Sequence, residues 1–172
     1  MRRFGVIVAL GAMLGMFTGV VTASPALAAR PKWGLLQAAP GTLPKSFCGF
    51  RVGVAYPVNK EYAKLLKSAD GSFTVLDTGS LKVSLTNLST GKAITVNASG
   101  PGKATIYADG SIADVATGHD LAAFAPADAK RFGIPTVSVI TGRTTSSVAA
   151  DGTFTSFIVK GHVLLDVCAA LG

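Results

Sequence analysis

The sequence predicts an all-β fold, a single antiparallel meander of about eight strands that forms a barrel or a sandwich, with one short helix in a crossover loop. Three observations lead to this prediction. Short segments alternate apolar and polar residues with the period of two that a strand requires. Asp-Gly pairs, which favour tight hairpin turns, begin at Asp70, Asp109 and Asp151. Two cysteines, Cys48 and Cys168, bracket this patterned region.

The first 28 residues have the composition of a cleaved signal peptide. Arg2 and Arg3 precede an uncharged apolar stretch from Phe4 to Val21, and Ala26-Leu27-Ala28 forms a small-x-small cleavage site. A retained membrane anchor is the alternative, because the apolar stretch approaches the length that spans a bilayer. The cleavage motif favours removal of residues 1–28, so we expect a secreted, extracellular protein with no retained transmembrane segment.

The charge balance of the chain is basic even without the two arginines of the leader, and the charges are spread along it. Such a balance attracts anionic partners, for example wall polymers or lipid head groups. The densest basic group consists of Lys60, Lys64 and Lys67. We expect no nucleic-acid partner, because export and the lack of an arginine–aromatic platform both argue against one.

Residues 29–46 are predicted to form an extended N-terminal arm, and residues 47–172 a single β-domain. Three prolines in the arm fix φ and remove backbone donors, which disfavours regular structure. Trp33 lies in this arm and is a candidate ligand contact, for example by stacking on a sugar. We favour the alternative that Trp33 anchors the arm to the domain surface, as amphipathic aromatic side chains commonly do.

The first strand is predicted over residues 47–56, and Pro57 ends it. Residues 59–69 are ambiguous. Asn59 is able to cap a helix there, or the segment is a strand that turns at Asp70-Gly71. We favour the hairpin, because Asp-Gly beside β-type sequence has a mechanistic basis. A helix would instead offer a lysine face to an anionic surface.

Four consecutive strands follow in an antiparallel meander. Each has an inward apolar side, and glycine-containing turns separate them. The predicted strands cover residues 81–86, 94–98, 104–108 and 112–117, the last of which stops at Gly118.

Residues 119–135 depart from the alternating pattern and contain a predicted short helix. Pro126 suits the first helical position and Gly133 the position after the end, with Asp128 in the first turn. The strand pattern then returns over residues 136–143, 144–149, 154–160 and 162–167.

Cys48 and Cys168 are predicted to form one structural disulfide, since an exported protein meets oxidising surroundings. The bridge needs Cα atoms about 4.4 to 6.8 Å apart, so it brings the first and last strands together, as closure of a barrel requires. Cys48 shares a strand face with Phe50 and Val52, whereas Cys168 lies opposite its apolar neighbours. Either a bulge intervenes or the last strand ends before Cys168.

The sequence contains no metal, cofactor or nucleophile motif. It has two histidines and one glutamate, and the disulfide takes both cysteines, so a zinc site lacks ligands. His119 and Asp120 lie at the mouth of the irregular segment, where catalytic residues are often carried. Adjacent residues rarely hydrogen-bond as base and orienting group, however, so we interpret His119 as a solvated loop residue.

Paired carboxylates for glycoside cleavage are conceivable among Asp109, Asp114, Asp120 and Asp151. Two of them, Asp109 and Asp151, occupy turn positions that favour aspartate for backbone reasons. We therefore assign no catalytic, cofactor-binding or metal residue, and keep Trp33, His119 and Asp120 as candidate contacts.

Several short motifs follow one another in order: Gly79-Ser80-Leu81, Thr86-Asn87, Thr90-Gly91-Lys92, Ser99-Gly100-Pro101-Gly102, Asp109-Gly110-Ser111, Gly142-Arg143 and Asp166-Val167-Cys168-Ala169-Ala170-Leu171. With them, residues 47–172 resemble a group of small secreted actinobacterial proteins of unknown function. The motifs are mainly turn glycines and the final cysteine, which are structural markers. The resemblance therefore implies a fold and a secreted bacterial localisation, and it carries over no activity or site residue.

From the sequence we expect a secreted, non-enzymatic β-module that binds a ligand or serves as a surface component. Its expected partner is a cell-wall polymer, an anionic surface or a small apolar ligand held inside the fold. One alternative is a small secreted hydrolase that uses His119, Asp120 and nearby carboxylates. Another is an extracellular protease inhibitor with residues 119–135 as its bait loop.

Overall fold

The computed structural model describes residues 31–172, so the predicted signal peptide, residues 1–28, lies outside the described part. Within residues 31–172 the chain forms nine strands and three short helices. In chain order they are β1 (Gly34–Leu35), β2 (Gly41–Leu43), α2 (Lys45–Cys48), β3 (Val52–Lys67), β4 (Phe73–Asn87), β5 (Ala93–Asn97), β6 (Gly102–Ile106), β7 (Ile112–Ala123), α3 (Pro126–Phe132), β8 (Val137–Val148), β9 (Phe154–Asp166) and α4 (Val167–Leu171).

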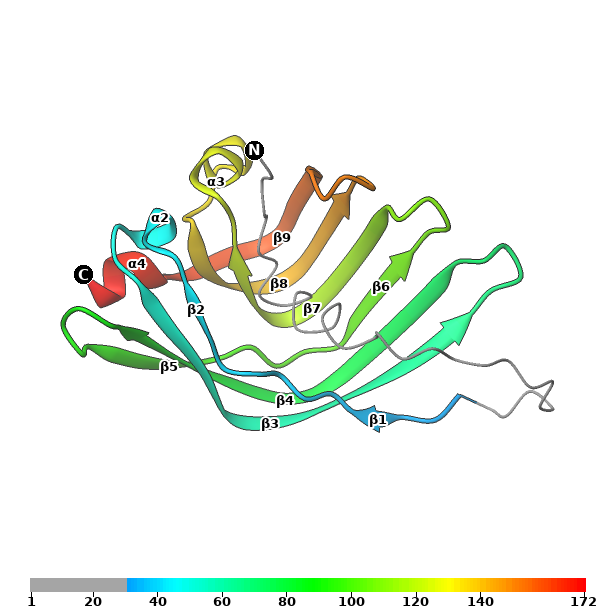
Figure 1. Cartoon of the computed structure of the whole chain (residues 1–172), viewed down its shortest axis with the longest axis horizontal. Helices are drawn as coiled ribbons and strands as arrows, with labels where there is room; N and C mark the ends of the chain where they lie inside the picture. Colours follow the sequence, from blue (N-terminus) through cyan, green and yellow to red (C-terminus); the bar gives the residue numbers. More distant parts are fainter. Residues whose placement is uncertain (1–30) are drawn as a thin grey trace.

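All nine strands belong to one antiparallel sheet, with the main order β1-β3-β4-β6-β7-β8-β9. The sheet is strongly curved and does not close, because its two end strands, β1 and β9, do not pair with each other (Figure 1). The all-β, antiparallel prediction is confirmed. None of the helices between residues 31 and 172 is long and apolar enough to cross a bilayer.

Glycines bend the long strands where the sequence had predicted strand ends. Gly118, Gly142 and Gly161 pair in register across β7, β8 and β9, and form a row over three neighbouring strands. A Cβ atom at Gly161 would overlap the carbonyl oxygen of Thr141, so the backbones approach more closely here than a side chain permits. The predicted strand end at Gly118 is therefore wrong, and the four strands predicted after Pro135 are two long, bent ones.

We expect Gly161→Ala to lower the free energy of unfolding by about 2 kcal/mol, because the added methyl group forces the two backbones apart. Gly41→Ala is the matched control, since a Cβ atom there would meet nothing within 4 Å. Chemical denaturation of both variants checks this prediction. Equal stability of the two variants would show that the bend does not depend on the missing side chain.

The hairpin predicted around Asp70-Gly71 is confirmed, and the helical alternative for residues 59–69 is wrong. The predicted first strand begins too early and ends too early. Residues 45–48 form α2, and β3 continues through Pro57 by means of a bulge between Ala55 and Val58. A bulge tolerates proline because it interrupts the ladder of backbone hydrogen bonds there.

The strands before Gly118 do not form the simple meander that the sequence suggested. β5 and β6 both pair with β4, at residues 82–86 and 73–77 respectively, so they follow one another along the same edge of β4. The connection through Gly100-Pro101 crosses between them without a hairpin. β5 therefore pairs with β4 and not with β7, whereas β6 pairs with both β4 and β7.

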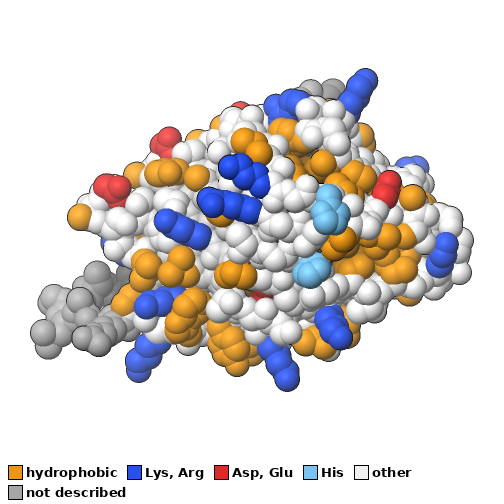
Figure 2. All heavy atoms as spheres, turned by 180° about the vertical axis from the view of Figure 1, so that it is seen from behind, with side chains coloured by type: hydrophobic (Ala, Val, Ile, Leu, Met, Phe, Trp, Pro, Cys, Tyr) orange, Lys and Arg blue, Asp and Glu red, His pale blue; other side chains and the backbone are white. Residues whose placement is uncertain are grey.

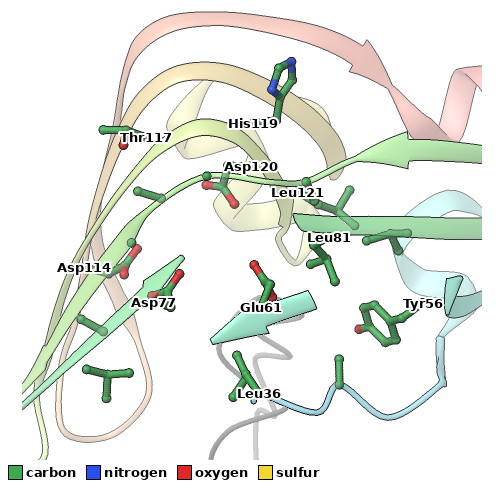
Figure 3. A pocket seen from close by; sticks show the side chains of 18 residues that line it. Leu36, Tyr56, Glu61, Asp77, Leu81, Asp114, Thr117, His119, Asp120 and Leu121 are labelled. Carbon is green, nitrogen blue, oxygen red and sulfur yellow. The ribbon is translucent and has the colours of Figure 1, made fainter. Parts of the chain in front are cut away.

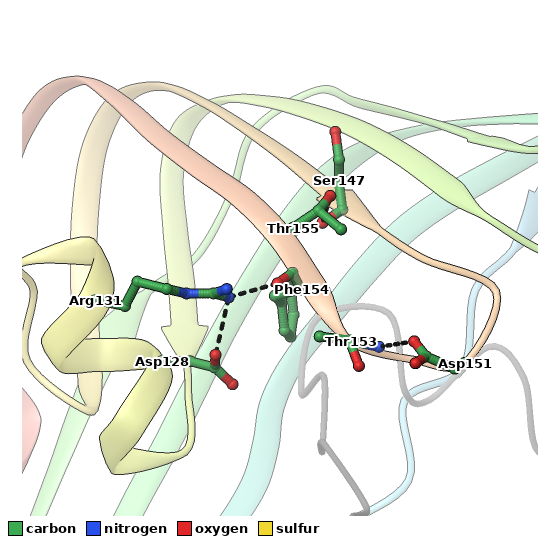
Figure 4. Close-up of polar contacts among 7 residues, drawn as sticks. All are labelled: Asp128, Arg131, Ser147, Asp151, Thr153, Phe154 and Thr155. Carbon is green, nitrogen blue, oxygen red and sulfur yellow. Dashed lines mark hydrogen bonds and ion pairs between the residues drawn. The ribbon is translucent and has the colours of Figure 1, made fainter.

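The predicted short helix is confirmed as α3, with proline in its first turn and Gly133 at its C-cap. Arg131 donates hydrogen bonds to Asp128 and to the backbone carbonyl of Phe154, which fastens α3 to the start of β9 (Figure 4). Phe132 of α3 packs with three other phenylalanines in edge-to-face or tilted contact, namely Phe124, Phe154 and Phe157. Residues 119–135 thus form the end of β7 and α3 around a buried Phe124, with exposed residues at 125–127 where the two elements join.

Cys48 and Cys168 form the predicted disulfide, with Cα atoms 5.0 Å apart. Neither cysteine lies on a strand, since Cys48 ends α2 and Cys168 lies in α4. The sequence had placed the two cysteines on different kinds of strand face, which would have hindered the bridge. The difficulty does not arise, because two helices bring the sulfur atoms together. The bridge covers the larger apolar core, which includes fully buried Leu85, Val137 and Leu171.

Candidate functional site

The concave side of the sheet contains a hollow of about 100 Å³ between β3, β4 and β7. Its walls are mainly apolar and include Leu36 from the N-terminal arm, Leu81 from β4 and Leu121 from β7. Four carboxyl groups also line it: Glu61, Asp77, Asp114 and Asp120 (Figure 3). No lysine or arginine is among the lining residues that the structure describes.

The strand period explains how Glu61 reaches the hollow. Successive side chains of a strand point to opposite faces, so Glu61 points inward while its neighbours Lys60 and Tyr62 point outward. Glu61 pairs with Gly79 on β4, where a Cβ atom would overlap the carbonyl oxygen of Lys60, so the backbones of β3 and β4 approach closely beside Glu61.

Asp77 lies on β4 opposite Gly102 of β6, and that glycine makes room for it. A Cβ atom at Gly102 would come within 2.5 Å of the Asp77 carboxylate oxygen Oδ1. The Asp77 carboxylate therefore occupies the space that any other residue at position 102 would fill. The Asp77 carboxyl therefore lies directly against the backbone of β6 at Gly102.

Asp114 and Asp120 both come from β7, on either side of the bend at Gly118. The bend brings them toward the same space, as Figure 3 shows. Asp120 accepts a hydrogen bond of 2.9 Å from the Oγ1 hydroxyl of Thr144 on β8. Thr144 is buried, so this contact fixes the orientation of the Asp120 side chain.

Burial disfavours the ionised form of all four carboxyls, and repulsion from neighbouring carboxylates adds to this for three of them, Glu61, Asp77 and Asp114. Burial, with repulsion from Asp77, raises the pKa of Glu61 to about 7. Burial also raises the pKa of Asp114 to about 7, helped by the charges of Asp120 and Asp77. Burial is also the main cause that raises the pKa values of Asp77 and Asp120. For Asp120, the hydrogen bond from Thr144 lowers the pKa and offsets part of this increase.

No cationic side chain neutralises these carboxyls within the described chain, where the one ion pair joins Arg131 to Asp128 on α3. The described residues also contain no group of histidine, cysteine and carboxyl side chains that converges closely enough to hold a metal ion. The four carboxyls therefore surround a space without meeting at one point. Such an arrangement suits an organic cation better than a metal ion.

The structure separates the two neighbouring candidate residues His119 and Asp120. Both residues contribute to the lining of the hollow, but β7 continues through them, so their side chains leave the strand in opposite directions, and the imidazole points away from the carboxyls in Figure 3. His119 and Asp120 cannot act as a base and its orienting group in this geometry, and the prediction that His119 lies on a loop is wrong. Trp33 lies outside the hollow and is half exposed.

The four aspartates considered for glycoside cleavage fall into two pairs. Asp114 and Asp120 line the hollow, whereas Asp109 and Asp151 cap turns by accepting backbone hydrogen bonds from Ser111 and Thr153. Sequence reasoning missed Glu61 and Asp77. The strand period could have identified Glu61. If residues 59–69 form a strand, Glu61 lies on the face opposite Lys60 and therefore points inward.

Comparison of the chain with protein-family models, with curated proteins and with solved structures finds no match.

Proposed function

We propose that this chain is an exported, non-enzymatic β-domain that binds a small ligand in the hollow, and that the ligand carries a cationic nitrogen on an apolar body. The observation that supports this proposal is a set of four carboxyls, with no lysine or arginine beside them, around a mainly apolar cavity. The disulfide and the signal-like N-terminus support export.

The energetic argument concerns desolvation. A half-buried carboxylate loses part of its hydration, and like charges nearby add repulsion, so the empty hollow is unfavourable at neutral pH. Ionisable groups whose burial destabilises the folded protein are typical of functional sites. An ammonium or amidinium group in the hollow would offset both costs and donate charge-assisted hydrogen bonds.

The size of the hollow limits the ligand. A buried cavity of about 150 Å³ accepts a benzene molecule, so a volume of about 100 Å³ fits a cationic head with a few carbon atoms. The rest of a larger ligand, such as the ring of benzylammonium, would extend out of the hollow past Leu36 at its wall. Small primary amines are therefore suitable probes.

We expect benzylammonium and butylammonium to bind at pH 8, whereas benzyl alcohol and butanol, which lack the charge, bind at least about tenfold more weakly. Isothermal titration calorimetry measures this difference. The double variant Glu61→Gln/Asp114→Asn is expected to bind the amines about tenfold more weakly than the wild type.

Asp109→Asn/Asp151→Asn is the matched control, because it removes two carboxyls from turns outside the hollow. It should keep the affinity of the wild type for both amines. Equal binding of amine and alcohol, or equal loss of affinity in both double variants, would contradict the proposal.

A second candidate function is hydrolysis, favoured by the pKa values of about 7 for Glu61 and Asp114. A carboxyl that titrates near neutral pH is able to act as a general acid. Turnover of chromogenic glycosides or esters that Glu61→Gln or Asp114→Asn abolishes would establish it. Absence of turnover in the wild type over a broad panel would leave ligand binding as the function.

A further inference from the structure

The outer, convex side of the same sheet differs in charge from the hollow. Around β1, β3, β4 and β6 it carries what we call the basic outer face, which consists of Trp33, Leu35, Lys60, Tyr62, Lys64, Lys82 and Lys103. Figure 2 shows the molecule from behind, with lysine or arginine side chains set among hydrophobic ones on the visible face.

The strand register places these side chains together. Leu35 of β1 pairs with Tyr62 of β3, so both project from the same face. Lys60 and Lys64 lie two residues to either side of Tyr62 and share its face. Lys64 pairs with Leu76 of β4, and Leu76 pairs in turn with Lys103 of β6. The face therefore extends across three strands.

The large apolar members of this face are about half exposed, as are five other large apolar residues of the described chain. Trp33 and Leu35 are each 49% exposed and Tyr62 is 47% exposed. Trp33 lies two residues before Leu35 along an extended chain, which puts it on the same side. The three large apolar side chains thus form one strip at the edge of the sheet, beside Lys60 and Lys64.

Residues 31–172 contain every acidic residue of the chain, and none lies on this face. Four line the hollow on the opposite side of the sheet, and three cap turns, namely Asp70, Asp109 and Asp151. The last two belong to helix ends, Asp128 in α3 and Asp166 at the N-cap of α4. The lysines of the basic outer face therefore have no carboxylate partner within the described chain.

We propose that the basic outer face docks the protein on a bilayer that contains anionic phospholipids. Lysines attract such a surface, and tryptophan and tyrosine prefer the depth of the lipid head groups. A soluble acidic polymer would also bind the lysines, but it offers no apolar region for Trp33, Leu35 and Tyr62. The three exposed apolar side chains thus favour a lipid surface.

The single tryptophan of the chain makes this proposal directly testable. The processed protein, its N-terminus checked by mass, is mixed with vesicles of phosphatidylglycerol and phosphatidylcholine, or of phosphatidylcholine alone. We expect Trp33 emission to shift to shorter wavelength, and brominated lipid to quench it, with the anionic vesicles only. Lys60→Glu/Lys64→Glu is expected to weaken vesicle binding at least about tenfold.

Lys45→Glu/Lys130→Glu is the control, because it changes the net charge equally at exposed positions on α2 and α3. It should retain at least about half of the vesicle affinity, whereas Leu35→Ala/Tyr62→Ala should abolish the emission shift. The proposal is overturned if anionic vesicles leave Trp33 emission unchanged, or if both charge-reversed variants lose binding equally. Binding to soluble polyglutamate but not to vesicles would assign the face to an acidic polymer instead.

Discussion

Replacing Cys48 and Cys168 together by alanine is expected to lower the free energy of unfolding by about 5 kcal/mol. The bridge closes a loop across a sequence separation of 120 residues, and the chain-entropy model gives about this value for a loop of that size. Since domains are stable by about 5 to 15 kcal/mol, the variant should lose a large part of its stability. Urea denaturation of the wild type and the double variant measures the difference.

The loss should be largest at the corner that the disulfide covers. Asn87 donates a hydrogen bond to the backbone carbonyl of Leu171, and Thr136 donates one to that of Phe47, so α2, α4 and the strand ends meet there. Wild type in a strong reductant is the control and should match the alanine variant. A loss below about 1 kcal/mol would show that packing of this corner alone closes the fold.

Asp114→Asn is expected to stabilise the protein at pH 8 by about 3 to 4 kcal/mol and to change its stability little at pH 4. Burial raises the pKa of Asp114 from 3.8 to about 7 in the folded protein. The folded state thus binds the proton more tightly than the unfolded state. The stability of the wild type is therefore highest below pH 4 with respect to this group and falls as the pH rises toward 7.

Thermal denaturation at pH 4 and at pH 8 tests this prediction. Asp109→Asn is the control, because hydrogen bonds from Ser111 lower the pKa of Asp109, and its removal gives no gain at pH 8. If Asp114→Asn destabilises the protein equally at both pH values, folding does not raise the pKa of Asp114, and the electrostatic description of the hollow is wrong.

The local signals in the sequence predicted turns and caps well. Asp70, Asp109 and Asp151 each accept the backbone hydrogen bond that their turns require, and α3 begins and ends where proline and glycine indicate. Strand ends were less predictable. Glycine and proline usually terminate a strand, but here Gly118 forms part of a bend and Pro57 lies at a bulge. The local sequence does not distinguish a strand that ends at such a residue from one that bends and continues.

The candidate site was only partly visible in the sequence. Asp114 and Asp120 were recognised as conceivable partners, but Glu61 and Asp77 come from another hairpin, and their approach depends on the pairing of β6 with both β4 and β7. Long-range pairing of this kind has no local signature. The orientation of His119 was not visible in the sequence either: this residue lines the hollow, but its ring points away from the carboxyls because β7 continues past Gly118.

The central claim is that the carboxyls of the hollow lack a counter-charge until a cationic ligand enters. Because Glu61 is the only glutamate of the chain, glutamate labelled with ¹³C at its side-chain carboxyl gives one signal from the hollow. A pH titration of this signal by NMR should have its midpoint near pH 7 in the free protein. Benzylammonium should lower the midpoint by about one unit or more. A midpoint near the ordinary value of 4.5, or one that benzylammonium leaves unchanged, would contradict the account.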